Sequence, residues 1–173
     1  METQRERLKL VTKKNYRKNV AAIVLNKGNK DLVAERSDVP GAFQFPQGGM
    51  NENEVEEEAI LRELREELGT DKFEIILKSE KTYRYDFPEE VKKIFENKYD
   101  GQEQRYFLIR FTGNDNEINL TSSDTEFKSF KWIPFSEDIY KNIIEFKRKV
   151  YKEVFNDFKD IINNLKKGDF EKK

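Results

Sequence analysis

The residues best suited to chemistry are glutamates in the segment from Gly48 to Thr70, GGMNENEVEEEAILRELREELGT. If the segment is helical, with ~100° between residues, four carboxylates fall within an arc of roughly 100°: Glu56, Glu63, Glu66 and Glu67. Apolar residues occupy the adjoining arc, so these carboxylates would be partly desolvated. Like charges at this spacing repel by about 0.2–0.5 kcal/mol per pair, and a bound cation would relieve the repulsion. Hard oxygen ligands select Mg²⁺ or Mn²⁺.

A solvated, glutamate-rich helix face is the alternative interpretation. We favour it for Glu57 and Glu58, whereas for Glu63, Glu66 and Glu67 the spacing alone leaves both interpretations open. Charge segregation along the chain has the same two interpretations. Residues 52–67 hold eight Glu against two Arg, and residues 1–36 hold ten Lys or Arg against four Asp or Glu. Such a pattern suits either a cation site that receives a polyanion or a set of solvated helix faces.

The composition limits which groups can do this chemistry. The chain has 173 residues, about the size of one domain, and contains no Cys and no His. Disulfides, thiolate nucleophiles and Cys-based metal sites are therefore excluded, and carboxylates, lysines or tyrosines must carry any acid–base or metal chemistry. The charged fraction is 39%, but 13% of the residues are aromatic, which favours a charged, folded domain over disorder.

We expect a cytoplasmic protein with one domain over residues 1–173. No apolar run approaches the ~20 residues that span a bilayer, residues 1–14 lack the apolar core of a secretory signal, and the absence of Cys agrees with a reducing compartment. Residues 1–14 and 166–173 are expected to be flexible.

The order of the predicted elements indicates the fold class. We expect strands at 19–26, 31–36, 43–46, 72–87, 104–111 and 126–132, with a hairpin turn at 27–30 and Gly48-Gly49 ending the third strand. A helix is expected at 54–68, stopped by Gly69, and a short helix or ordered loop at 88–97. Apolar residues recur every three or four positions from Ile143 to Leu165, which predicts a long terminal helix. This order suggests an α+β or α/β/α layered domain.

The glutamate segment resembles the Nudix box, G-x₅-E-x₇-R-E-U-x-E-E-x-G-U, where U is aliphatic. The matching residues are Gly48, Glu54, Arg62, Glu63, Leu64, Glu66, Glu67 and Gly69, and Thr70 departs from the final U. Seven fixed identities match by chance roughly once in 10⁸ start positions at ordinary residue usage. Motifs outside the box, among them Tyr16 to Val20 and Gln44 to Gly49, resemble those of bacterial RNA pyrophosphohydrolases and the similar diadenosine polyphosphate hydrolases.

The resemblance implies a Nudix α/β/α sandwich with a mixed central sheet, a loop–helix–loop box at 48–70 and a long C-terminal helix. It also implies that two or more Mg²⁺ or Mn²⁺ ions are bound by Gly48 (through its carbonyl), Glu63, Glu66, Glu67 and Glu126. Glu63, or alternatively Glu126, would orient or deprotonate the attacking water. Glu54 would pair with Arg62 to hold the loop. Without the resemblance, Glu126 would be interpreted as an exposed strand-end residue.

Other matching positions imply a site for the substrate. They are Arg17, Lys18, Arg36, Tyr85, Gln102, Gln104, Phe146 and Lys147. The basic residues would hold a 5′-triphosphate, the Gln and Tyr side chains would hydrogen-bond its phosphates, and Arg36 and Phe146 would stack on a base. Phe146 also lies on the apolar stripe of the terminal helix, so a core role is its alternative.

The implied function is hydrolysis of 5′-triphosphate RNA to 5′-monophosphate RNA with release of pyrophosphate, which would promote mRNA decay. Neither a membrane nor DNA is expected as a partner, and no protein partner follows from the residues. The alternative enzyme is a dinucleoside polyphosphate hydrolase. The alternative from another class is a non-catalytic nucleotide- or RNA-binding module, which is disfavoured because all the box glutamates are present.

Overall fold

The computed structural model describes residues 13–121, 127–141 and 143–166. Glu126 and nearly all of the two ends expected to be flexible lie outside these residues. No helix in the described ranges is long and apolar enough to cross a membrane.

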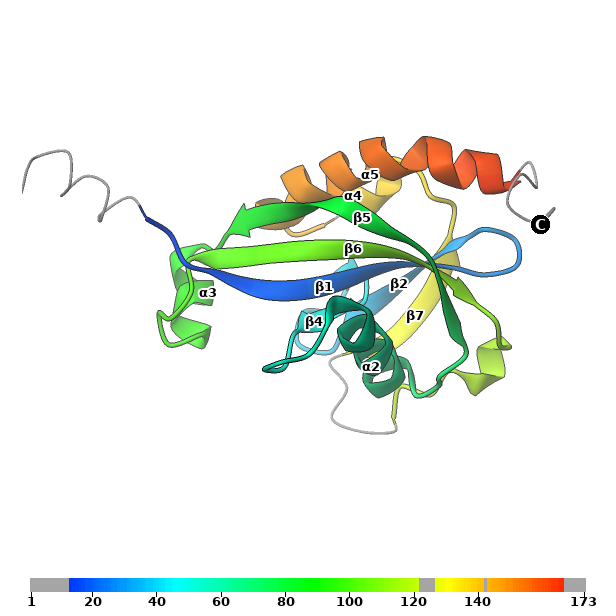
Figure 1. Ribbon diagram of the computed structural model, residues 1–173, viewed down its shortest axis with the longest axis horizontal. Coiled ribbons are helices and arrows are strands. Elements are labelled where there is room, and N and C mark those ends of the chain that lie inside the picture. The colour runs from blue at the N-terminus through cyan, green and yellow to red at the C-terminus, as the bar shows by residue number, and fades with distance from the viewer. Residues whose placement is uncertain (1–12, 122–126, 142, 167–173) are drawn as a thin grey trace, which may run out of the picture.

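A seven-stranded mixed sheet forms the centre of the fold (Figure 1). Its strands are β1 (Tyr16–Leu25), β2 (Asp31–Arg36), β3 (Phe43–Gln44), β4 (Gln47–Gly49), β5 (Phe73–Asp86), β6 (Gly101–Phe111) and β7 (Phe127–Ile133). The order is β3-β2-β1-β6-β5, with β4 paired to β1 and β7 paired to β2. Only the β1–β6 pairing is parallel among the described strands, with Tyr16 opposite Gly101 and Leu25 opposite Arg110.

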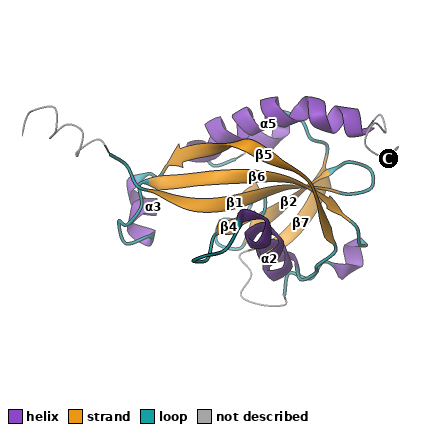
Figure 2. Cartoon of the chain, viewed as in Figure 1, coloured by secondary structure: helices purple, strands orange, loops and turns teal. Residues whose placement is uncertain are grey.

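Helices cover both faces of this sheet (Figure 2). They are α2 (Glu56–Leu68), α3 (Glu89–Ile94), α4 (Asp138–Lys141) and α5 (Glu145–Lys166), with a short 3₁₀ turn η1 (Asp115–Glu117). The long helix α5 lies over one face and α2 over the other. The expected α/β/α arrangement with a mixed sheet is therefore confirmed.

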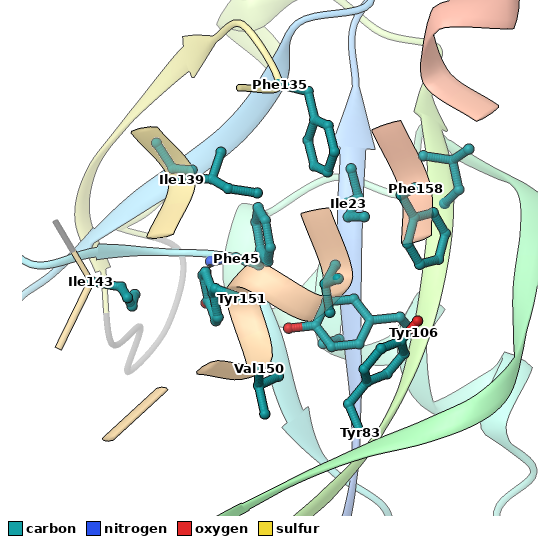
Figure 3. Packing of buried hydrophobic residues seen from close by; sticks show 14 of the residues in the cluster. Ile23, Phe45, Tyr83, Tyr106, Phe135, Ile139, Ile143, Val150, Tyr151 and Phe158 are labelled. Carbon is teal, nitrogen blue, oxygen red and sulfur yellow. Dashed lines mark hydrogen bonds between the residues drawn. The ribbon is translucent and has the colours of Figure 1, made fainter. Parts of the chain in front are cut away.

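Strand alternation creates two separate cores. Successive residues of a strand point to opposite faces, so Ile23 in β1 packs toward α5 whereas Ala22 packs toward α2, and both are fully buried. Figure 3 shows the α5-side core, in which Phe45 stacks on Tyr151 with ring centroids 4.6 Å apart. A strand that is buried on both faces needs apolar residues at successive positions, which explains the continuous apolar run in the sequence.

Helix α2 has the apolar face that the spacing predicts, with one exception. Ala59, Ile60, Leu64 and Leu68 are fully buried, but Leu61 is exposed because it lies at the edge of the stripe. The helix begins at Glu56, two residues later than expected. It ends at Gly69, whose φ of 69° is the left-handed conformation that favours glycine, and whose N–H donates to the Arg65 carbonyl.

The segment after β2 differs from the prediction. We expected Gly48-Gly49 to end one strand at 43–46, but Gly48 and Gly49 belong to a separate strand, β4, which pairs with Asn19 to Ala21 of β1. Glycine has both a backbone N–H and a backbone C=O, so it can pair with a neighbouring strand despite its low strand propensity. This pairing places β4 beside α2.

Candidate active site

Arg62 holds the loop before α2 against the helix. Its Nε donates to Glu54 Oε2 at 2.7 Å, and its Nη2 donates to Glu54 Oε1 and to the Gly49 carbonyl, both at 2.9 Å. The Asn51 N–H also donates to Glu54, at 2.8 Å. These bonds, the one from Arg62 first, lower the pKa of Glu54 to about 2, so Glu54 is ionised at neutral pH.

The carboxylates expected to bind cations are gathered at one edge of α2, next to β4. Gly48 lies directly against Glu63, because a β-carbon on Gly48 would overlap the Glu63 carboxylate. Arg62 Nη1 donates to Glu63 at 2.9 Å and to Glu66 at 3.2 Å. Glu67 is buried and Glu66 is exposed. The described residues do not already form a group of three acidic side chains that could hold a metal, since Glu63 and Glu66 turn toward Arg62.

The residues present nevertheless fit a divalent cation. Arg62 supplies one positive charge to three carboxylates, those of Glu54, Glu63 and Glu66, so these four groups together carry a net negative charge. The donor set consists of carboxylate and carbonyl oxygens, which hard cations prefer. The space at Gly48 admits the Glu63 carboxylate because Gly48 has no side chain. Rotation of Glu63 and Glu66 away from Arg62 would complete the set.

Glu56 does not belong to this acidic group, although its helical position fell in the same arc. Its carboxylate pairs with Lys78 at 3.0 Å and with Arg105 at 3.1 Å, both from the sheet. It lies two turns before Glu63, so a shared helix face does not bring the two carboxylates together. Glu57 pairs with Lys78 and Glu58 is exposed, as expected for a solvated face.

A cluster of basic and aromatic side chains lies on the other side of β4. A β-carbon on Gly49 would overlap the Arg17 guanidinium, which donates to Gln102 at 3.4 Å and lies 5.3 Å from the Phe95 ring centre. Gln102 in turn donates to the Tyr85 hydroxyl at 3.1 Å. Burial raises the pKa of Tyr85 above its ordinary value, so Tyr85 is a neutral phenol.

Helix α5 contributes Phe146 and Lys147 to the same cluster. The Phe146 ring lies 5.7 Å from that of Tyr85, and the Lys147 ammonium lies about as close to both rings. Lys147 is only 6% exposed, and its Nζ donates to Gln44 Oε1 at 3.1 Å. Lys147 therefore brings a buried positive charge next to the rings of Tyr85 and Phe146.

Three of the expected substrate residues are placed differently. Lys18 is exposed and, by strand alternation, points away from its neighbour Arg17. Arg36 pairs with Asp38 through two bonds of 2.8 and 2.6 Å, although its charge is near enough to oppose the rise in the pKa of Tyr85. Gln104 is 2% exposed, and its Nε2 donates to Asn19 and Gln47, while its Oε1 is buried without a hydrogen-bond partner among the described residues.

Sequence reasoning missed four residues of this region: Asn19, Gln44, Gln47 and Phe95. A usable signal was available for the amides, since polar amides recur in otherwise apolar strands, at Asn19 before a buried run and at Gln102 and Gln104 in alternation. No comparable signal marked Phe95, which follows α3 and meets Arg17 only in the folded chain.

Comparison with known proteins agrees with this geometry. The NUDIX domain model matches residues 15–154. The RNA pyrophosphohydrolase of Nitratiruptor sp. is 46% identical over 152 residues, covering 85% of this chain and 96% of that protein. The RNA pyrophosphohydrolase of Helicobacter pylori strain P12 is 43% identical over 150 residues, covering 84% and 95%.

Solved structures show the same fold. The E. coli dihydroneopterin triphosphate pyrophosphohydrolase superposes with a TM-score of 0.62 at 15% identity, covering 83% of this chain and 99% of that chain. A C. elegans Ap4A hydrolase complex superposes with a TM-score of 0.58 at 19% identity, covering 80% and 94%. With the family model spanning most of the sequence and the box residues gathered at one edge of α2, the chain belongs to the Nudix family.

Proposed function

We propose that the protein converts the 5′-triphosphate end of RNA to a 5′-monophosphate and releases pyrophosphate, which would open the transcript to decay. The observation that carries this proposal is that relatives named RNA pyrophosphohydrolase are 41–46% identical to the chain over most of its length. The site supports the same chemistry, because an acidic helix edge and a cluster of basic and aromatic side chains meet at β4. All 173 residues are proposed to form one domain.

Nudix hydrolases generally depend on divalent metals, and here Glu63, Glu66, Glu67 and the Gly48 carbonyl would hold Mg²⁺ or Mn²⁺. Such ions supply positive charge to the triphosphate and lower the pKa of water. Glu126 remains a proposed further ligand, and it lies outside the described residues.

Residues of the chain then carry out the proton transfer that accompanies hydrolysis. Glu63 accepts a proton as the water oxygen attacks the α phosphorus, and the bond from that phosphorus to the pyrophosphate oxygen breaks. Glu126 is the alternative proton acceptor. No covalent intermediate is required, which suits a chain without Cys or His.

The basic and aromatic cluster beyond β4 holds the substrate during this step. Arg17 and Lys147 offer positive charge to the phosphates, and Gln102 and Tyr85 offer hydrogen bonds. Phe146 presents an aromatic face on which a base can stack. Arg36 would cover the other face of the base after leaving Asp38.

Product analysis on RNA labelled at the γ phosphate tests this proposal. With Mg²⁺ present, we expect labelled pyrophosphate as the released product, and a gain in kcat/KM when the RNA is lengthened from a dinucleotide. Diadenosine polyphosphates are assayed in parallel. If they are hydrolysed with a higher kcat/KM and longer RNA brings no gain, the dinucleoside polyphosphate assignment replaces the RNA assignment. If no polyphosphate is hydrolysed but triphosphate RNA still binds, the protein is a binding module. The cytoplasmic location expected from the sequence stays a prediction.

A further inference from the structure

Three amide side chains form a hydrogen-bonded bridge across three strands of the sheet. Asn19 lies in β1, Gln47 in β4 and Gln104 in β6. Asn19 Nδ2 donates to Gln47 Oε1 at 2.8 Å, and Gln104 Nε2 donates to Asn19 Oδ1 at 2.9 Å and to Gln47 Oε1 at 3.4 Å. Asn19 and Gln104 are each only 2% exposed. We call this set the amide bridge.

The amide bridge converges on Gln47. Two donors, from Asn19 and Gln104, meet the single oxygen Oε1 of Gln47, so they restrain that side chain from two strands. Strand β4 is only three residues long, and its register with β1 runs from Ala21 opposite Gln47 to Asn19 opposite Gly49. So short a ladder has few backbone bonds to hold it in place, and the side-chain bonds of the bridge add to them.

The residue next to Gln47 is the one that touches the cation-binding edge of α2. Gly48 lies directly against the Glu63 carboxylate. Consecutive strand residues point to opposite faces, so Gln47 points to the α5 side while Gly48 meets α2. The amide bridge therefore lies on the opposite face of the sheet from the acidic edge of α2, and the backbone of β4 connects the two.

We propose that Asn19, Gln47 and Gln104 are positioning residues, which fix Gly48 relative to Glu63 and thereby set the affinity for divalent cations. This rests on the cation site proposed above. Asn19 Nδ2 and Gln104 Nε2 already donate within the bridge, which favours a positioning role over direct recognition of phosphate. Groups that hold a ligand residue in place commonly change metal affinity by about 10–100-fold when removed.

The test measures Mn²⁺ binding without turnover, on the full chain, from the electron paramagnetic resonance signal of free Mn²⁺. Gln47→Met removes the shared acceptor while keeping the length of the side chain, and we expect its Kd for Mn²⁺ to rise at least 10-fold. The matched control is Tyr83→Phe, which removes another polar contact on the same sheet face, the 2.8 Å bond to Asp157. Its Kd should stay within twofold of wild type. A Gln47→Met protein that is folded by circular dichroism and binds Mn²⁺ like wild type overturns the proposal, as does an equal loss in Tyr83→Phe.

A second measurement uses the wild-type protein, so it does not depend on how a variant folds. In a Mg²⁺ titration followed by NMR, the side-chain amide signals of Asn19 and Gln104 should shift with the same Kd as the backbone N–H of Gly48. If Gly48 shifts and these side-chain signals do not, the bridge does not position the site. Mn²⁺ binding by a wild-type protein that cannot hydrolyse RNA would instead contradict the proposed substrate and leave the positioning role intact.

Discussion

The two sides of β4 carry opposite chemistry. On the α2 side Gly48 meets the Glu63 carboxylate, whereas on the α5 side Gly49 meets the Arg17 guanidinium. Both glycines leave room that any side chain would fill, so the charged groups on both sides approach the same short stretch of backbone. A strand without side chains thus separates groups of opposite charge while keeping both close to one short stretch of backbone, an arrangement that suits the polyphosphate and cations proposed above.

The two sides also differ in how their charges are held. On the α2 side Arg62 holds Glu54, Glu63 and Glu66, which are all within a few residues of one helix. On the α5 side Arg17 and Lys147 donate to amide oxygens, of Gln102 and Gln44 respectively. These partners are neutral groups, whereas the partners of Arg62 are carboxylates.

The largest expected effect is the loss of Glu63. Glu63→Gln removes the proposed proton acceptor and one cation ligand, so kcat should fall by about 10²–10⁴-fold while triphosphate RNA still binds. Glu58→Gln, on the exposed face of the same helix, is the control and should change kcat less than twofold. Rapid-quench kinetics and RNA binding by fluorescence anisotropy measure both. Full activity in Glu63→Gln would move the role of base to another residue.

Alanine at each glycine of β4 should separate the two sides. Gly48→Ala displaces Glu63, so the Kd for Mn²⁺ should rise about 10–100-fold. Gly49→Ala displaces Arg17, so the KM for triphosphate RNA should rise about 10-fold, a loss of ~1.4 kcal/mol, with the Kd for Mn²⁺ unchanged. Each new methyl group meets the far end of a flexible side chain, so both proteins should fold. Identical defects in the two variants would mean that β4 does not separate two sites.

Phe146 decides between base stacking and core packing on the α5 side. Phe146→Leu keeps apolar volume but removes the aromatic face, so KM for RNA should rise by about 5–100-fold, corresponding to ~1–3 kcal/mol of stacking. Phe158→Leu lies on the same helix in the core and should lower the melting temperature without changing KM. Steady-state kinetics and calorimetry distinguish the two. A change in melting temperature alone for Phe146→Leu would assign Phe146 to the core.

Asp31 is a carboxylate on the α5 side of the sheet whose burial is not offset by hydrogen bonds among the described residues. It is fully buried, and neither oxygen has a hydrogen-bond partner within the described ranges. Burial raises its pKa well above the ordinary value of about 4, so the unfolded chain ionises first as pH rises, and the folded state is progressively penalised. Asp31→Asn should raise the free energy of unfolding at pH 7 by about 1–3 kcal/mol, and the gain should vanish toward pH 3. Denaturation at both pH values measures this, and an unchanged stability at pH 7 would contradict it.

Glu54 on the α2 side should show the opposite pH dependence, with the smallest effect. Its pKa of about 2 in the folded state lies below the value of about 4.3 in the unfolded chain. Ionised Glu54 therefore stabilises the fold fully above about pH 4.3, and this contribution is lost as the pH falls through 2. Glu54→Gln should flatten the rise of stability between pH 2 and 4.5, as followed by urea denaturation. A slope equal to that of wild type would show that the Arg62 pair does not couple to folding.

Much of the fold followed from local pattern. The apolar spacing predicted α2 and α5 to within two residues of their ends, and the strand from Asp31 to Arg36 was placed correctly. The apolar periodicity of a helix and the glycine that ends it depend on residues close together in the sequence, so both can be recognised from the sequence alone. The separation of β3 from β4 was missed, since nothing local signals that a Gly-Gly pair will be recruited by β1.

The family and the acidic edge of α2 could be predicted from the sequence alone, because Glu63, Glu66 and Glu67 are neighbours on one helix and stay close together in any fold that keeps the helix. The folded structure was needed to show that Glu56 pairs with Lys78 and Arg105, that Gln104 belongs to the amide bridge, and that Gly48 and Gly49 face opposite charges. Those relations depend on which distant strands pair and in which register. A shift of one residue would exchange the two faces of β4.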